Sequence, residues 1–131
     1  MKMKTDDLIA RAKGARENAY APYSRFSVGA AIVTAEGTIF TGVNVENASY
    51  GLAICAERSA AVAAVSAGYR DFDAIAVAGP DATVTAPYGA CRQFLNEFNP
   101  ALTVAYTTPD GVRVTTLDKL LPDAFGPKNL V

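Results

Sequence analysis

The first regular pattern of apolar and polar positions in the chain has a helical period. It predicts a helix over residues 6–20, with Thr5 or Asp6 as the N-cap and Pro22 shortly after its end. The apolar positions of this helix are Leu8, Ile9, Ala12, Ala15 and Ala19. One face of the helix is therefore expected to pack against the rest of the protein.

The pattern then changes to one typical of strands. Residues 26–34 (FSVGAAIVT) are apolar and β-branched, the Glu36-Gly37 turn follows, and residues 38–43 read as the returning strand of a hairpin. Beyond a loop over residues 44–52, the alanine-rich stretch 54–67 ends at Gly68 and predicts a buried helix. The remaining elements are expected to be a strand at 74–78, a helix at 90–98, strands at 103–107 and 112–116 around a Pro-Asp-Gly turn, and a short helix in the tail at 117–131.

Strands interleaved with helices in this order predict an α/β fold. We expect a three-layer α/β/α sandwich around a five-stranded mixed sheet, formed by residues 1–131 as a single domain. The balance of 50% hydrophobic and 19% charged residues is that of an ordinary globular protein. No apolar run approaches the roughly 20 residues that span a bilayer, and the charged start of the chain lacks an apolar stretch behind it. These features favour a cytoplasmic protein without a membrane partner.

Charge and residue usage narrow the chemistry further. The net charge is -1 and acidic and basic residues are interspersed, so the sequence predicts no basic surface for a long nucleic acid. A nucleotide-like partner should therefore be small. The sequence contains no histidine, which excludes Ser-His-Asp and Cys-His catalysis and histidine zinc motifs. With two cysteines and no sign of export, we expect reduced thiols or metal thiolates in place of a disulfide.

Both cysteines stand at the start of a predicted helix. Cys55 lies in Cys-Ala-Glu-Arg and Cys91 in Pro-Tyr-Gly-Ala-Cys-Arg-Gln, and helix N-termini favour the thiolate form that binds zinc. Glu57 follows Cys55 by two residues and is therefore placed to move protons beside a metal as general base and general acid. Taken singly, either cysteine also fits a plain core position and Glu57 fits a solvated helix surface.

Longer segments carry a family resemblance. The segments AYAPYSRFSVGAA, NVENASYGLAICAER, PYGACRQFLNEF and LLPDAFGP occur in this order over residues 7–130. In order and spacing they resemble the small, homotetrameric, zinc-dependent type of cytidine deaminase, a class whose zinc site has a non-ligating glutamate and a Pro-Cys-x-x-Cys element. The resemblance implies one Zn²⁺ per subunit, ligated by Cys55 and Cys91, and a zinc-activated water that attacks C4 of cytosine while Glu57 transfers protons.

The same resemblance implies roles for substrate-binding residues. Phe26 would be an aromatic wall for the pyrimidine, Asn44 and Glu46 would bind the ribose hydroxyls, and the Ala56 backbone N–H would point toward the pyrimidine. Phe125 would enter the pocket of a neighbouring subunit. The residues alone leave other roles open, because Phe26 also fits the core of a strand and Asn44 also fits a turn.

Three residues near these segments have roles that the resemblance alone supplies. Tyr50 resembles a residue at the contact between subunits, where Phe125 is also expected. Arg58 and Arg92 would offset thiolate charge, or they are ordinary surface cations.

Tyr88 departs from the family pattern. Where the family has Pro-Cys-Gly-x-Cys, this chain has Pro-Tyr-Gly-Ala-Cys, so one of the three protein ligands of a catalytic zinc site is missing. Three alternatives fit this residue: Tyr88 replaces the thiolate as a phenolate, a water fills the position, or the ring excludes the metal. These three alternatives stay open in the sequence.

The resulting prediction is a hydrolase that deaminates cytidine and deoxycytidine in pyrimidine salvage. One alternative is a catalytically impaired family member, natural or engineered, that still binds nucleosides despite Tyr88. A second is a deaminase of another aminopyrimidine nucleoside. A thiol redox protein is disfavoured, because the cysteines do not form a CxxC pair.

Overall fold

A five-stranded mixed sheet forms the centre of the computed structural model, which describes residues 5–130. The sheet order is β2-β1-β3-β4-β5, in which β3 and β4 are parallel and all other neighbours are antiparallel. In chain order the elements are α1 (Thr5–Ala15), η1 (Arg16–Asn18), β1 (Gly29–Thr34), β2 (Ile39–Val43), η2 (Tyr50–Leu52), α2 (Ala56–Ser66), β3 (Phe72–Ala78), α3 (Gly89–Asn96), β4 (Thr103–Thr108), β5 (Gly111–Thr116), α4 (Leu117–Leu120) and η3 (Pro127–Asn129). The predicted hairpin and mixed sheet are confirmed.

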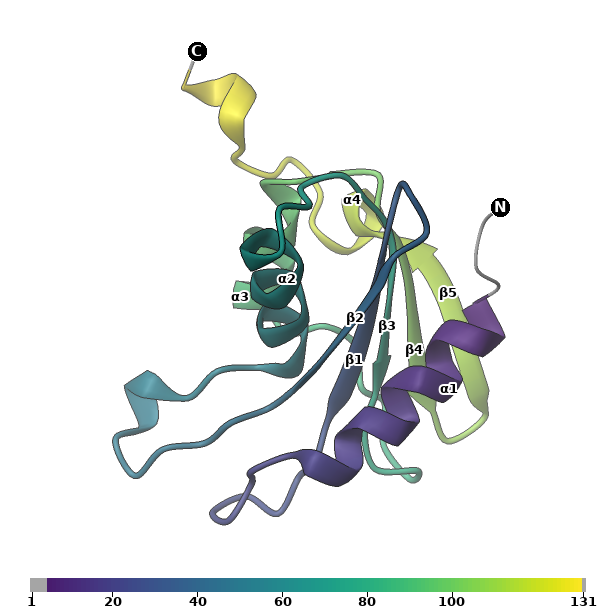
Figure 1. Cartoon of the computed structure of the whole chain (residues 1–131), viewed down its shortest axis with the longest axis vertical. Helices are drawn as coiled ribbons and strands as arrows, with labels where there is room; N and C mark the ends of the chain where they lie inside the picture. Colours follow the sequence, from purple (N-terminus) through teal and green to yellow (C-terminus); the bar gives the residue numbers. More distant parts are fainter. Residues whose placement is uncertain (1–4, 131) are drawn as a thin grey trace.

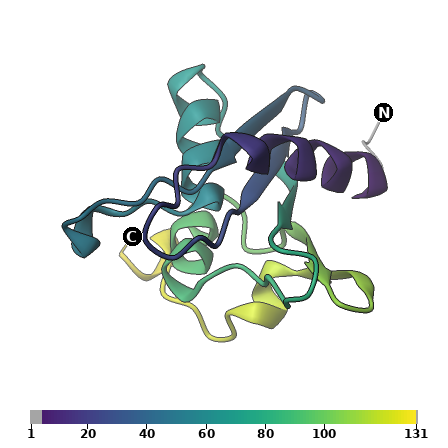
Figure 2. The same cartoon turned by 90° about the horizontal axis from the view of Figure 1, so that it is seen from below.

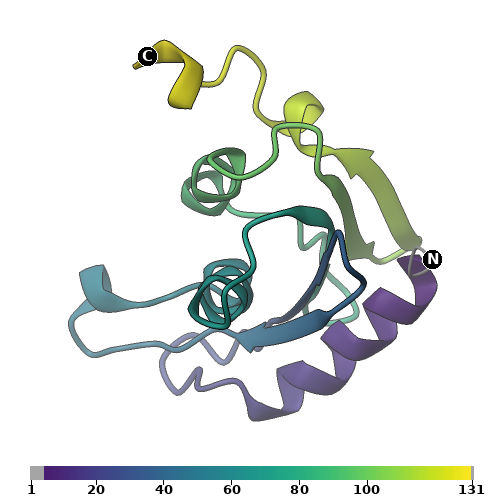
Figure 3. The ribbon, with the colours of Figure 1, turned by 45° about the horizontal axis from the view of Figure 1, so that its top comes forward.

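Helices cover both faces of this sheet, as Figures 1 and 3 show. Strand β1 is buried along its whole length, and its side chains alternate between the two faces. Ala31 and Val33 pack in the cluster that contains α1, whereas Ala30 and Ile32 pack in the cluster that contains α2 and α3. The predicted three-layer α/β/α sandwich is therefore confirmed.

Helix α2 approaches the sheet closely because it is rich in alanine. Its buried alanines are Ala56, Ala60, Ala61 and Ala64, none of which has solvent-exposed area. Opposite this face, a Cβ atom added to Gly42 of β2 would lie only 2.3 Å from the Ala60 backbone nitrogen. Small residues on both elements thus fix the position of α2, and with it the start of that helix.

Several predicted boundaries are wrong by two to five residues, and backbone hydrogen bonds explain two of them. The first helix ends at Ala15 because Tyr20 pairs its backbone with Asn44 and Glu46, at N···O distances of 3.0 and 2.8 Å. The first strand begins at Gly29, because the Asn44 side chain takes the backbone groups that residues 26–28 would offer to a ladder. In both places a tertiary contact replaces the local pattern.

The segment between β2 and α2 extends away from the sheet, as Figure 2 shows. Residues 44–55 form a long excursion that is tied back by isolated bridges of Val45 to Tyr20 and to Ile54. Tyr50 and Leu52 on this excursion are 80% and 66% exposed. Over residues 5–130, no helix combines the length and apolar character needed to cross a bilayer. The charged residues 1–4 and Val131 lie outside the described part of the chain.

Candidate metal and nucleoside site

An open pocket of about 470 Å³ lies where the N-termini of α2 and α3 meet the segments before β1 and after β2. This volume lies in the range of small-molecule sites. Among the residues that line it are Phe26, Asn44, Glu46, Cys55, Glu57 and Tyr88. The structure thus gathers, at one opening, residues from segments that are up to 64 positions apart in the sequence.

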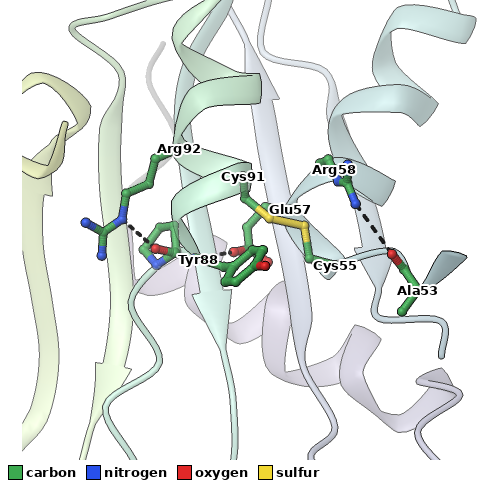
Figure 4. Close-up of a disulfide and its surroundings, with 8 residues drawn as sticks. Ala53, Cys55, Glu57, Arg58, Tyr88, Cys91 and Arg92 are labelled. Atoms are coloured by element: carbon green, nitrogen blue, oxygen red, sulfur yellow. Dashed lines mark hydrogen bonds between the residues drawn. A yellow bond between two sulfur atoms is a disulfide. The ribbon is translucent and has the colours of Figure 1, made fainter. Parts of the chain in front are cut away.

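Cys55 and Cys91 lie at the adjacent starts of two helices. Cys55 is the N-cap of α2, and Cys91 is the third residue of α3 with no exposed surface. Their sulfur atoms are joined in a disulfide, so the expectation of separate thiols is corrected (Figure 4). Because helix N-termini stabilise anions, reduction of this bond yields two thiols that are both biased toward thiolate.

Cysteine, histidine, aspartate and glutamate are the residue types that most often bind metals. Among residues 5–130, Cys55, Glu57 and Cys91 are the one place where three or more such residues lie close enough to hold a single ion. One donor atom from each lies within 4.8 Å of the others. Zinc accepts thiolate sulfur and carboxylate oxygen at about 2.0–2.3 Å, which places two ligands of one ion about 3.5–4 Å apart. The Cα atoms of the cysteines are 7.2 Å apart, which is wider than the usual range for disulfides. The donor set therefore fits a zinc ion.

Glu57 is almost completely buried, with 3% of its surface exposed. This burial raises the pKa of the Glu57 carboxyl, because charge is poorly solvated there. Hydrogen bonds from backbone N–H groups and the charge of Arg58 oppose part of the rise in pKa. One of these donors is the Tyr88 N–H, 3.4 Å from Oε2 of Glu57. A carboxyl in this environment is suited to hold and release a proton beside a bound substrate.

The two arginines that follow the cysteines point to backbone carbonyls. Arg92 donates from Nε to the Pro87 carbonyl at 2.6 Å and from Nη1 to the Leu120 carbonyl at 2.9 Å, and it turns away from the sulfurs in Figure 4. Arg58 has only a long contact of 3.5 Å to the Ala53 carbonyl, and its buried Nε has no hydrogen-bond partner. Of these two cations, Arg58 retains an unused donor next to Glu57.

Asn44 and Glu46 both face the pocket, and both already have protein partners. The Asn44 amide accepts from the Val28 N–H at 2.9 Å and donates to the Phe26 carbonyl at 2.8 Å. The Glu46 carboxylate accepts from the Ser24 hydroxyl and from the backbone N–H groups of Tyr23 and Ser24. These bonds lower the pKa of Glu46 and hold its carboxylate in place. Each side chain keeps lone pairs, and Asn44 one N–H, for a ligand.

The remaining predicted residues divide into two groups. Phe26 is 38% exposed and lines the pocket, and Ala56 lines it as the first residue of α2, where the N–H has no helical partner. Phe125 does not line the pocket. It is 57% exposed, and its carbonyl accepts hydrogen bonds from Gln93 and Asn96. Because its expected role lies in a neighbouring subunit, that role stays a prediction.

Two polar residues of this region, Ser24 and Thr85, were not predicted as site residues. Ser24 positions the Glu46 carboxylate, and Thr85 lines the pocket from the segment between β3 and α3. The turn around Arg25, which has a φ of 58°, brings Ser24 to Glu46. No periodic signal marks either residue in the sequence.

Comparisons with known proteins agree with this geometry. Residues 2–107 match the family described as the cytidine and deoxycytidylate deaminase zinc-binding region. The chain belongs to the cytidine deaminase family. The matched residues include Cys55, Glu57 and Cys91, whereas Phe125 lies beyond their end. The zinc-binding character of this family agrees with the sulfur and carboxylate donors at the pocket.

Relatives of this family member resemble it over nearly its whole length. A cytidine deaminase from Sporosarcina psychrophila is 47% identical over 98% of this chain and 96% of its own. Another, from Halalkalibacterium halodurans, is 48% identical over 90% of this chain and 91% of its own. The crystal structure of cytidine deaminase from Burkholderia pseudomallei is 56% identical and covers 94% of this chain and 100% of its own, with a TM-score of 0.89. The family fold is therefore shared from α1 to the tail.

Proposed function

We propose that this family member hydrolyses cytidine and deoxycytidine to uridine and deoxyuridine, with release of ammonia, as a step of pyrimidine salvage. The observation that carries this proposal is the grouping of Cys55, Glu57 and Cys91, whose donor atoms lie within 4.8 Å of one another at one pocket. The relatives named cytidine deaminase support the substrate class. In the reaction, water adds at C4 of the pyrimidine and the amino group leaves.

Cys55 and Cys91 are the residues that would hold the zinc ion. When bound, zinc supplies Lewis acidity that makes a water molecule nucleophilic at neutral pH. The two cysteines lie on adjacent helix N-termini, so the protein stabilises both thiolates before any metal enters. Arg58 adds positive charge on the same side of α2, next to Glu57.

Glu57 moves the protons of the reaction. It takes one proton from the attacking water and delivers it to N3 of the pyrimidine. It then takes the second proton from the new hydroxyl group at C4 and delivers it to the amino group, which leaves as ammonia while the C4 carbonyl forms. Its burial supports this role, because burial raises the pKa of the carboxyl above its ordinary value and so makes the protonated form easier to reach. The Tyr88 N–H, 3.4 Å from Oε2, is a hydrogen-bond donor to this carboxylate.

The pocket walls would hold the nucleoside. Phe26 offers an aromatic face to the pyrimidine, and the free N–H of Ala56 points to the same region at the start of α2. Asn44 and Glu46 offer an amide and a carboxylate to the ribose hydroxyls, from positions already fixed by their backbone partners.

We further propose that residues 1–131 act as one domain, that the chain assembles as a homotetramer and that it works in the cytoplasm. Tyr50 and Phe125 are 80% and 57% exposed, as expected of side chains that contact a neighbouring subunit. A native mass measurement tests the assembly, and a monomer at micromolar concentration would contradict it.

A second candidate function is nucleoside binding without catalysis. Tyr88 favours this alternative, because it occupies the start of α3 where a third metal ligand is expected. A cytidine-dependent rise in melting temperature of zinc-free protein, without turnover in zinc, would support it.

The deciding experiment measures ammonia release from cytidine by reduced protein in zinc-containing buffer. Glu57→Gln should lower kcat by about 10²- to 10⁴-fold, because it removes the proton carrier and keeps the side-chain shape. Glu36→Gln makes the same chemical change at an exposed turn and should leave kcat unchanged. Full activity of Glu57→Gln would exclude the proton-transfer role.

A further inference from the structure

The donor set at the pocket contains only two thiolates. A catalytic zinc site normally has three protein ligands and an open position for water or substrate. Here Cys55 and Cys91 supply two, and the third donor atom within 4.8 Å belongs to Glu57. The proposed reaction needs that carboxylate as a proton carrier. A separate third ligand would therefore have to come from another element around the pocket.

Tyr88 stands at the position where the family pattern has a third thiolate. It is the N-cap of α3, three residues before Cys91, and its N–H lies 3.4 Å from Oε2 of Glu57. A thiol at position 88 would carry its sulfur directly on Cβ, beside the Glu57 carboxylate. The phenol oxygen of Tyr88 is instead separated from Cβ by the full length of the ring. Its donor atom cannot occupy the place that a sulfur on the same Cβ would take.

The exposure of Tyr88 agrees with this geometric argument. The side chain is 68% exposed and lines the open pocket, although Cys91 on the same helix has no exposed surface. Figure 4 shows the Tyr88 ring below the two sulfurs, beside the Glu57 carboxylate. Tyr88 is therefore part of the solvent-facing wall of the pocket and is not packed in the core beside Cys91.

We propose that this chain holds zinc through only two of its own side chains, the thiolates of Cys55 and Cys91, with solvent at the remaining positions. This inference rests on the proposed function, because it takes Glu57 to be the proton carrier and not a metal ligand. Tyr88 is the residue that keeps the site at two thiolates. The two thiolate charges balance the charge of Zn²⁺, so the site has no net charge. Because only two side chains hold the ion, it exchanges with zinc in solution.

The expected size of the effect follows from the energetics of zinc sites. Structural zinc sites bind with about 10–16 kcal/mol from four ligands, so each ligand contributes roughly 100- to 1,000-fold in affinity. Tyr88→Cys should therefore tighten zinc binding by about 100- to 1,000-fold. Tyr88→Phe removes only the phenol oxygen and should leave the zinc Kd within about threefold of the original protein.

The experiment titrates reduced protein with zinc against a chromophoric chelator, in the absence of nucleoside. Tyr20→Cys is the matched control, because it also replaces a tyrosine of similar exposure, 55%, by a thiol, but outside the pocket. It should not change the Kd of the pocket. Cobalt substitution gives a second readout, in which the thiolate-to-metal charge-transfer band of Tyr88→Cys should grow by about half, as three thiolates replace two.

Four results would overturn the proposal. Weaker zinc binding by Tyr88→Phe would show that the phenol is a ligand, and an unchanged Kd in Tyr88→Cys would show that position 88 does not face the ion. A large loss of zinc affinity in Glu57→Gln would make Glu57 the third ligand. Failure of reduced protein to bind zinc stoichiometrically at any concentration would remove the two-thiolate site.

Failure of the inference can be separated from failure of the proposed function. Zinc binding is measured without substrate. Weak zinc binding by a protein that releases no ammonia from cytidine would therefore contradict the proposed deaminase activity and leave the two-thiolate zinc site supported. Ammonia release by a protein whose zinc Kd matches that of Tyr88→Cys would remove only the inference.

Discussion

The close contact between β2 and α2 predicts that Gly42→Ala will damage the site from a distance. The added Cβ would lie 2.3 Å from the Ala60 nitrogen, 2.7 Å from the Ala56 oxygen and 2.8 Å from the Ser59 carbonyl carbon. All three are backbone atoms of α2, so no side chain can rotate away. The helix itself has to move.

The magnitude of the movement follows from these distances. Ordinary contact with a Cβ begins at 3.4 Å, so α2 must withdraw from the sheet by about 1 Å. Overpacking of this kind costs about 1–3 kcal/mol of stability. Because Cys55 is the N-cap of α2 and Glu57 lies in its first turn, the same displacement shifts both residues relative to Cys91. A misplacement of about 1 Å in an active site can cost about 100-fold in rate.

Gly29→Ala provides a matched control. Its Cβ would lie 2.1 Å from the Ala12 oxygen and 2.6 Å from the Arg16 nitrogen, so the strain falls on the opposite face of the sheet. Both variants should lose about 1–3 kcal/mol in urea unfolding. Only Gly42→Ala should also lose about 100-fold in kcat/KM, measured well below both unfolding midpoints. Wild-type kcat/KM in folded Gly42→Ala, or an equal loss in Gly29→Ala, would refute this reasoning.

Two further predictions concern charge and redox state. Ser24→Ala should raise the pKa of Glu46, since the Ser24 hydroxyl and N–H are the strongest influences that lower it. Because the folded pKa is lowered, the stabilisation by Glu46 is present above the unfolded pKa and is lost as pH falls through the folded value. NMR titration should therefore show the Glu46 transition at higher pH in Ser24→Ala, and an unchanged transition would contradict the assigned bonds. Oxidised protein, in which Cys55 and Cys91 form a disulfide, should bind no zinc until a reductant is added, because disulfide sulfurs are not thiolate ligands. Zinc binding by protein that has no free thiols would exclude Cys55 and Cys91 as the ligands.

The fold could be predicted in outline because its elements have strong local signals. The apolar, β-branched run that contains GAAIVT predicted the strand β1, and the alanine-rich stretch predicted α2 as a buried helix. The ends of the elements were less predictable, because hydrogen bonds between distant residues set them. Tyr20 leaves the helical pattern to pair with Asn44 and Glu46, a contact that no window of local sequence contains.

The site was predictable where residue type alone restricts the chemistry. A chain without histidine has few zinc ligands, so Cys55 and Cys91 stood out, and the structure brings Glu57 to them. The support of Glu46 by Ser24 was not predictable, because it depends on the turn at Arg25. The burial that raises the pKa of Glu57 was likewise invisible, since glutamate in a helix is usually exposed.

Cys55 and Cys91 are separated by 36 positions, and the segment between them contains α2 and β3. Any bridge between the two sulfurs closes this segment into a loop and lowers the entropy of the unfolded chain. In the chain-entropy model, a loop of this length corresponds to about 4 kcal/mol. An ion at this position would therefore act as a removable cross-link between the second helix and the third. The fraction of folded molecules would then follow the supply of the metal, and a chelator would lower both the activity and the lifetime of the fold.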